Sequence, residues 1–393
     1  MECRHFISNT CFRLGKDRLI YIVDPHTQRA WDTKLRGLLE RLSGKCGVFL
    51  TRESELSVFD RWCNSESIRV TRVISNILKL SKDDALLLDS RAKLTQEHLV
   101  ALENDTVRII LSANHFFVPE KIILELIQKA ASRLNLTIVV ENLASVPHVL
   151  DCWGIPNLSP DILLVPPVLD SKRDFQRFSL VDDSFDWGNR LIDRRVLHAG
   201  AIVYHRPRNR WWQEKFRVLE YCPARTMVNT NSKNLEITDL SKVIEDNSRR
   251  DQWGNKIRRR LEIILGIQKK RYDAYYSVNL PREFKNHLFF ICPEDIFEVV
   301  PQIGFQAMRS GMILIGSSTK AYESLGFSDC VNYLSVGETW SLASLEKVLG
   351  KIKELDITAI EAMLNCSQIL LAEIESAAIE TLEVLCKKQE FRE

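Results

Sequence analysis

One segment of the chain, His287 to Ser318, carries the residues with the clearest chemical potential. A predicted strand ends at Pro293, and the acidic loop after it contains Glu294 and Glu298. A predicted helix begins near Gly304, and the N-terminus of a helix offers N–H groups and a partial positive charge that suit a phosphate. Because doubly wound sheets bind ligands at the carboxyl ends of their strands, this segment predicts a nucleotide-sized anion site with a carboxylate beside it.

A second group of candidates consists of cations that follow a predicted strand over residues 195–204. Arginine and lysine bind phosphate groups by charge-assisted hydrogen bonds, so these residues are candidates for an anion site, with a solvated basic helix face as the alternative. The candidates are Gly200, Arg206, Arg210 and Lys215, where the glycine would end the strand.

Polar side chains at the ends of strands in the first half of the chain could act as a general base. An imidazole or a carboxylate can take the proton of an attacking hydroxyl group if it lies within hydrogen-bonding reach. His115 is the first candidate and Asp24 the second. A capping or packing role is the alternative for both residues.

The elements that must position these residues alternate between short apolar runs and amphipathic segments. Seven runs in the first half read as strands, at residues 18–24, 46–51, 67–74, 85–90, 107–113, 136–142 and 161–168. Several are nearly continuous in Val, Ile and Leu, as in strands buried on both faces of a parallel sheet. Repeated alternation of strand and helix predicts an α/β doubly wound domain.

The second half repeats this alternation after a polar stretch over residues 170–193. Strands are predicted at 195–204, 226–231, 286–293, 311–318 and 330–336, helices at 210–222 and 302–311, and a long helix over 357–390. We therefore predict two Rossmann-like doubly wound domains, 1–175 and 194–365, followed by a C-terminal helical tail over 366–393.

Composition excludes several classes of protein. The 393 residues include 54 basic and 52 acidic side chains, a balance that argues against a whole-surface binder of nucleic acid or membrane. The 10 cysteines show no close pairing. The sequence has no signal peptide and no run of about 18 uncharged apolar residues, so we expect a cytoplasmic protein. The first strand–helix turn lacks G-x-G-x-x-G, which argues against NAD, and no acidic pair is placed to hold a metal.

A basic helix is predicted over residues 249–271, with Ile and Leu on its apolar face. A solvated face is its simplest interpretation. Contact with an anionic membrane surface or a lipid acceptor is the second interpretation, and nucleic-acid binding is the third.

The segment around Glu298 resembles the donor-binding segment of glycosyltransferases with the GT-B fold, especially the retaining family that includes sucrose and glycogen synthases. That family has two glutamates separated by seven residues, followed by A-M-A-S-G. Here Glu298 is followed by seven residues, then Gln306, Ala307, Met308, Arg309, Ser310 and Gly311. The segment over residues 271–293 also resembles exostosin-type transferases, which invert the anomeric centre.

The resemblance implies a metal-independent enzyme that moves a sugar from a nucleotide diphosphate sugar to an acceptor hydroxyl, in polysaccharide or glycoconjugate synthesis. The first domain would bind a saccharide or glycolipid acceptor, Glu298 would reach the donor sugar, and Gln306 would hold the ribose. The other residues expected to contact the donor are Pro293, Glu294, Ile303, Gly304 and Phe305.

Three alternatives remain open at this stage. A GT-B sugar-nucleotide epimerase would use the same donor pocket without an acceptor. A non-catalytic GT-B-like binding module would explain why Gln306 replaces the second glutamate. A generic strand–helix–strand unit would need Gly311 only to end a helix.

Overall fold

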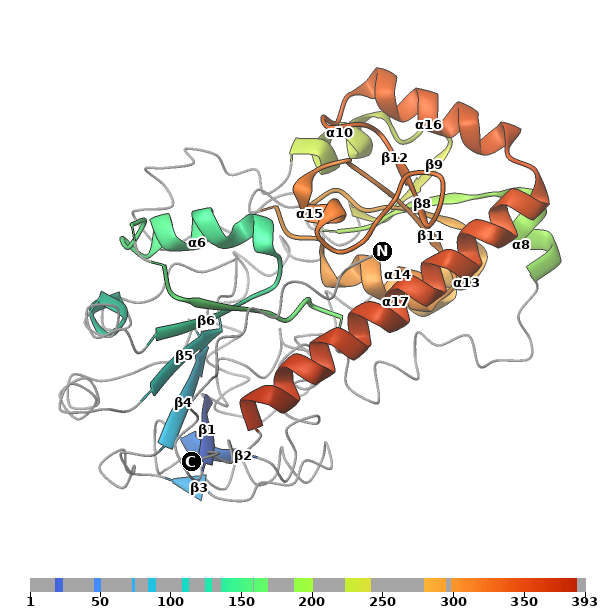
Figure 1. Ribbon diagram of the computed structural model, residues 1–393. Coiled ribbons are helices and arrows are strands. Elements are labelled where there is room, and N and C mark those ends of the chain that lie inside the picture. The colour runs from blue at the N-terminus through green and yellow to red at the C-terminus, as the bar shows by residue number, and fades with distance from the viewer. Residues whose placement is uncertain are drawn as a thin grey trace, which may run out of the picture. The chain divides into compact units, whose positions relative to one another are not determined.

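The computed structural model describes residues 18–23, 46–50, 73–74, 84–89, 108–112, 124–128, 136–157, 159–168, 187–200, 223–241, 279–294 and 298–386 (Figure 1). The chain divides into two compact units. The first unit combines Met1–Phe175 with Ala372–Glu393, and the second is Gln176–Leu371. The domain bounds inferred from the sequence stay a prediction.

The first unit contains a seven-stranded parallel sheet with the order β3-β2-β1-β4-β5-β6-β7. Each strand overlaps one of the seven predicted apolar runs, which confirms a doubly wound α/β unit. Helix α6 (Val146–Cys152) follows β6 and a short 3-10 turn, η4 (Leu143–Ser145). The strands are β1 (Arg18–Val23), β2 (Cys46–Leu50), β3 (Val73–Ile74), β4 (Asp84–Asp89), β5 (Arg108–Ser112), β6 (Leu136–Val140) and β7 (Asp161–Leu164).

The second unit contains a five-stranded parallel sheet with the order β12-β11-β10-β8-β9. Strand β9, the next described strand along the chain after β8, pairs with one side of β8. Strand β10, which comes later, pairs with the other side. The order therefore reverses at β8, and the carboxyl ends of β8 and β10 flank a topological switch point. The strands are β8 (Val196–His198), β9 (Ile237–Asp239), β10 (Phe289–Ile291), β11 (Ile313–Gly316) and β12 (Tyr333–Ser335).

Helices cover both faces of this second sheet. Helices α10 and α16 lie on one side of it, and α13 and α14 lie on the other (Figure 1). The helices of the unit are α8 (Trp187–Asp193), α10 (Pro223–Asn231), α13 (Leu280–Asn286), α14 (Gln302–Arg309), α15 (Lys320–Glu323) and α16 (Leu342–Glu354). The long α17 (Ile357–Cys386) belongs to this unit up to Leu371 and to the first unit from Ala372 onward.

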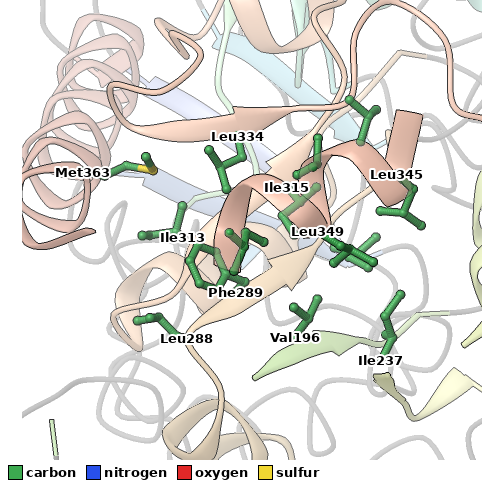
Figure 2. Packing of buried hydrophobic residues seen from close by; sticks show 14 of the residues in the cluster. Val196, Ile237, Leu288, Phe289, Ile313, Ile315, Leu334, Leu345, Leu349 and Met363 are labelled. Carbon is green, nitrogen blue, oxygen red and sulfur yellow. The ribbon is translucent and has the colours of Figure 1, made fainter. Parts of the chain in front are cut away.

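The core of the second unit explains why its strands are strongly apolar. Phe289, Ile313 and Leu334 come from three adjacent strands and pack in one buried cluster with Leu345 and Leu349 of α16 (Figure 2). On the opposite face, the ring of Phe284 in α13 meets Phe290 edge-on, with ring centroids 5.5 Å apart. Strands buried on both faces produce the continuous apolar runs seen in the sequence.

The prediction of a strand over residues 226–231 is wrong, because this segment lies in helix α10. Pro223 is its first residue, a position where proline is favoured because the missing N–H is not needed there. Thr230 Oγ1 and Asn231 Nδ2 each donate to the backbone carbonyl four residues earlier. Burial of Val228 in the core outweighs the strand preference of the β-branched residues.

Helix α17 confirms the predicted helical tail. Its residues 357–383 form the one helix, within the described part of the chain, that is long and apolar enough to cross a membrane by length and composition. Buried side chains recur along it at three- and four-residue spacing, as in a helix that packs one stripe against protein. Buried members of this stripe are Ile360, Met363, Leu364, Ser367, Leu370, Leu371, Ile374, Ala378 and Leu382.

Candidate functional site

The candidate site lies where β8 and β10 end at the same edge of the second sheet. The two strands are parallel neighbours, with His198 aligned to Ile291. The residues that follow them, Gly200 and Pro293, therefore emerge side by side at the switch point. Both were predicted to contact the donor, and the topology brings them to one edge.

Gly200 allows a guanidinium group to approach its backbone closely. Its φ of +149° favours glycine, and a Cβ at this position would lie 3.2 Å from Nη1 of Arg225 and 3.3 Å from Cζ. Nη2 of Arg225 donates to the carbonyl oxygen of Pro293 at 3.5 Å. A single buried arginine from α10 thus contacts the segments that follow both β8 and β10.

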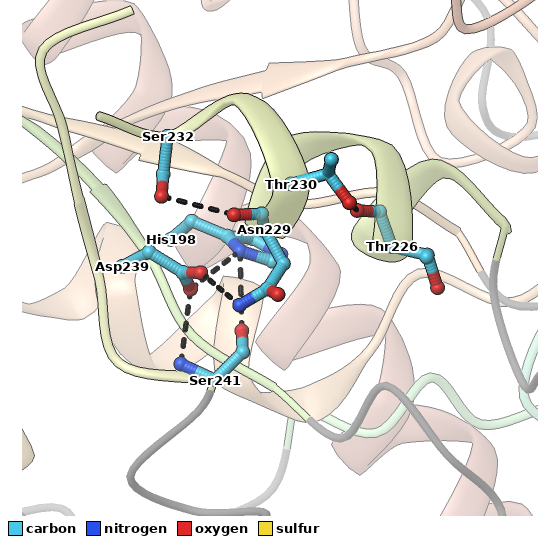
Figure 3. A network of polar contacts seen from close by, with 7 residues as sticks. All are labelled: His198, Thr226, Asn229, Thr230, Ser232, Asp239 and Ser241. Carbon is cyan, nitrogen blue, oxygen red and sulfur yellow. Dashed lines mark hydrogen bonds and ion pairs between the residues drawn. The ribbon is translucent and has the colours of Figure 1, made fainter. Parts of the chain in front are cut away.

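A buried polar network fixes the ends of β8 and β9 beside this arginine (Figure 3). Nδ1 of His198 lies 3.0 Å from Oδ1 of Asp239 and 3.2 Å from Oγ of Ser241. Asn229 of α10 donates to the other carboxylate oxygen, and the backbone N–H of Ser241 donates to Oδ1 at 2.9 Å. Because the serine and the aspartate share one ring nitrogen, this is not the arrangement of a Ser-His-Asp relay.

The network holds its members in defined charge states. Complete burial lowers the pKa of His198, and the nearby charge of Arg225 adds to this effect. Burial alone would raise the pKa of Asp239, but the hydrogen bond from His198, the charge of that imidazole when protonated, and hydrogen bonds from Ser241 outweigh it and lower that pKa to about 2. At neutral pH the network is therefore a neutral imidazole that donates Nδ1–H to a carboxylate.

Glu298 has an unusual backbone for a residue that is not glycine. Its φ is +57°, in the left-handed region where L-residues are strained. The three other described non-glycine residues with positive φ, Arg194, Glu236 and Cys330, precede strands β8, β9 and β12. Glu298 alone among these four follows a strand, on the carboxyl edge where ligands bind, and strained residues concentrate at functional sites.

Helix α14 begins directly after this loop and packs against the end of β10. A Cβ on Gly304 would lie 2.6 Å from Sγ of Cys292, so only glycine fits this contact without a shift. The N-cap residue, Pro301, provides no side-chain hydrogen bond to the first turn. The N-terminus of α14 is therefore held close to the carboxyl edge of β10, with no hydrogen bond from its own N-cap side chain.

The A-M-x-S-G part of the sequence motif has a structural explanation of its own. Gly311, at φ +66°, follows the last helical turn, and its N–H donates to Met308 O while Met312 N–H donates to Ala307 O. These two bonds form a Schellman motif, which uses glycine to end a helix. Gly311 therefore needs no ligand to account for it.

Other donor-site candidates divide between core and edge. Phe305 is fully buried in the core, and Gln306 is only 8% exposed. Ile303 is half-buried in the first turn of α14. The ribose role of Gln306 stays a prediction, and it requires that this amide become accessible to a hydroxyl group.

Glu294 lies next to an aromatic side chain that sequence reasoning did not single out. Nε1 of Trp340, in the segment between β12 and α16, donates to Oε2 of Glu294 at 3.2 Å. Trp340 also packs against the core cluster of Figure 2. This hydrogen bond connects the carboxylate to the segment that follows β12, the outermost strand on that side of the sheet. A tryptophan that closely follows a predicted strand was the signal that could have identified this contact.

Several predicted residues lie outside the described part of the chain: Asp24, His115, Arg206, Arg210, Lys215 and the basic helix over 249–271. Arg225, which directly precedes the segment predicted as a strand, was not among the candidates. In the described ranges, no group of three or more His, Cys, Asp or Glu side chains could hold a metal ion.

Comparisons with known proteins identify the fold. No protein-family model matches the chain, and no curated protein matches it in sequence. A glycosyltransferase from Rickettsia africae ESF-5 has a similar structure, with a TM-score of 0.54, 10% identity, and coverage of 94% of this chain and 99% of that chain. Anabaena Alr3699/HepE in complex with UDP has a TM-score of 0.50 and 11% identity, with coverage of 93% and 99%. The predicted GT-B fold, with two Rossmann-like units, is confirmed.

Proposed function

We propose that this protein is a glycosyltransferase that moves a sugar from a nucleotide diphosphate sugar to an acceptor hydroxyl. The bond between the anomeric carbon and the diphosphate oxygen breaks, and a bond from the acceptor oxygen to the same carbon forms. The acceptor proton passes to a base or to the leaving diphosphate. Support comes from the fold, from a solved relative of that fold named a glycosyltransferase, and from another bound to UDP.

The observation that carries the proposal is the position and backbone of Glu298. Its carboxylate belongs to the loop between β10 and α14, at the carboxyl edge beside the switch point. A strained backbone at +57° sets the direction of this side chain, and such strain is retained where the position of a group matters. In our proposal, Glu298 contacts the donor sugar.

The diphosphate would lie against the N-terminus of α14 and the segment after β8. Charge develops on the leaving oxygen as the glycosidic bond breaks, and N–H groups with nearby cations stabilise it there. We propose that this stabilisation needs no metal, and that a cation from the set Arg206, Arg210 and Lys215 contributes. The acceptor would be a saccharide or glycolipid, with polysaccharide or glycoconjugate synthesis in the cytoplasm or at the membrane surface as the setting.

Calorimetry with UDP-, GDP- and ADP-sugars tests the proposal, first without and then with added Mg²⁺. We expect one donor to bind without metal and to be hydrolysed slowly when no acceptor is present. Glu298→Gln should abolish this hydrolysis while the affinity for the corresponding nucleoside diphosphate changes by less than about threefold, since the carboxylate contacts the sugar rather than the phosphates. Glu346→Gln, an exposed glutamate on α16, is the matched control and should behave as wild type.

Other outcomes would assign the protein differently. Reversible interconversion of two nucleotide sugars would identify an epimerase. Nucleotide binding with no turnover in any condition, and no effect of Glu298→Gln, would identify a binding module. If no nucleotide or nucleotide sugar binds, the transferase proposal fails. The anomeric configuration of the product, determined by NMR, separates retention from inversion, and in the inverting case His115→Ala and Asp24→Ala test the base.

A further inference from the structure

Helix α10 brings a permanently charged group to the switch point of the second sheet. Arginine stays protonated at all physiological pH values, and Arg225 is only 4% exposed. Its guanidinium packs against the Cα position of Gly200 and donates to the carbonyl of Pro293. These two residues follow β8 and β10, the two strands that flank the switch point. Doubly wound sheets bind their ligands at such a point.

The position of Arg225 is fixed from two sides. On its own helix, Asn229 is one turn further along and donates to Asp239, which in turn is bonded to His198 at the end of β8. On the other side, Gly200 has no Cβ, and a Cβ there would lie 3.2 Å from Nη1 of the guanidinium. Arg225 therefore connects α10 to the ends of β8 and β10 and holds the two segments in register.

From this geometry we infer that Arg225 is a positioning residue for the diphosphate of the donor. It sets the backbone on which the phosphates rest and places a buried positive charge beneath that backbone. This inference rests on the proposed function, and it names the diphosphate as the part of the donor that Arg225 recognises. A guanidinium inside protein acts on an anion through a lower effective dielectric than water, so its influence does not require direct contact.

The inference predicts a selective loss of affinity that a purely structural role would not produce. In the full-length chain, Arg225→Met should weaken binding of UDP by at least about tenfold, while binding of uridine, which has no phosphate, changes by less than about twofold. Calorimetry measures the first affinity and ligand-observed NMR the second. If the wild type prefers another base, GDP with guanosine or ADP with adenosine replaces this pair.

Two further variants keep the test decisive. Arg225→Lys keeps the charge but loses the planar fork, and we expect a smaller loss for UDP than with methionine, again with uridine unchanged. This variant carries the test if Arg225→Met does not fold. Arg282→Met removes an exposed arginine of α13 and should leave both affinities unchanged.

The failure of this inference differs from failure of the proposed function. If the wild type binds no nucleoside diphosphate, the proposed function fails and the inference fails with it. If the wild type binds UDP but the Arg225 variants lose UDP and uridine to the same extent, or lose neither, the transferase proposal stands and the positioning role of Arg225 is wrong. A dependence of UDP affinity on salt that is shallower in Arg225→Met than in wild type would support the inference.

Discussion

Sγ of Cys292 lies 2.6 Å from the position that a Cβ on Gly304 would occupy. The end of β10 and the first turn of α14 therefore meet at a glycine, and this contact determines how close the helix N-terminus comes to the strand edge. The same contact joins the two parts of the proposed donor site, because Pro293 follows Cys292 and Glu298 precedes Gly304. Packing of the fold and the geometry of the proposed site are therefore coupled at this point.

The first prediction is that Gly304→Ala destabilises the second unit. The added methyl group must displace Cys292 or move the helix, and overpacking of this kind costs about 1 to 3 kcal/mol. Gly350→Ala is the control, because Gly350 lies inside α16, where a Cβ would meet no described atom outside its own helix within 4 Å. That variant should gain about 0.5 to 1 kcal/mol from helix preference. Thermal unfolding measures both, and equal effects in the two variants would contradict the close contact.

The second prediction concerns Gly316 and Tyr322, which pack at the end of β11. A Cβ on Gly316 would overlap the ring of Tyr322, whose hydroxyl donates to the carbonyl of Cys292. Gly316→Ala should therefore cost about 1 to 3 kcal/mol in the wild-type background. In a Tyr322→Leu background the cost should be smaller, because a shorter side chain leaves space for the methyl group.

A double-mutant cycle on the free energy of unfolding provides the measurement. We expect an interaction energy of about 1 kcal/mol between the two substitutions, since residues in direct contact are coupled. Costs that simply add would show that the tyrosine ring does not determine the need for glycine at position 316.

Sequence reasoning located four of the five strands of this sheet, missed β9, and identified the contacts between segments poorly. Runs such as residues 289–291 and 313–315 can be recognised as strands from the sequence, because strands buried on both faces are apolar throughout. Glu298 was found from motif spacing, but its positive φ depends on the path of the loop between β10 and α14. No local pattern indicates that Arg225 reaches Gly200, because that contact joins a helix and a strand end through tertiary packing.

The error at residues 226–231 has a specific cause. Thr and Val favour strands when they pack on a pleated surface, and the helix-start signal of Pro223 was not taken into account. Arg225 directly precedes this segment and belongs to the same helix, so it was not recognised as a helical residue facing the strand ends. A candidate residue can be judged only after the element that carries it has been assigned correctly.

The third prediction is that acid destabilises the region around the His198 network. Burial lowers the pKa of His198, so the folded state does not take up the proton that the unfolded state binds below about pH 6.5. The unfolded state then binds more protons, and stability falls as the pH drops through this range. Asp239, with its pKa lowered to about 2, adds a second loss as the pH falls from its ordinary value of 3.8 toward 2.

Hydrogen exchange of peptides covering β8 and β9 at pH 7 and pH 5.5 gives a local measurement of this effect, after correction for the intrinsic pH dependence of exchange. Protection should decrease at the lower pH in the wild type and change less in His198→Gln. His148→Gln, in helix α6 of the first unit, is the control and should keep the wild-type dependence in β8 and β9. An undiminished pH dependence in His198→Gln would assign the effect to another group, of which His287, also with a lowered pKa, is the first to examine.

The fourth prediction distinguishes a packed helix from a membrane span in α17. Ile360 is fully buried, whereas Ile369 on the same helix is 51% exposed. In a packed helix, Ile360→Lys buries a charge and should cost on the order of 4 kcal/mol, while Ile369→Lys should change stability by less than about 0.5 kcal/mol. In a membrane span, lysine at either position would be costly. Melting temperatures of both variants, with fractionation of the expressed protein, test this, and comparable disruption by the two lysines would contradict the packed arrangement.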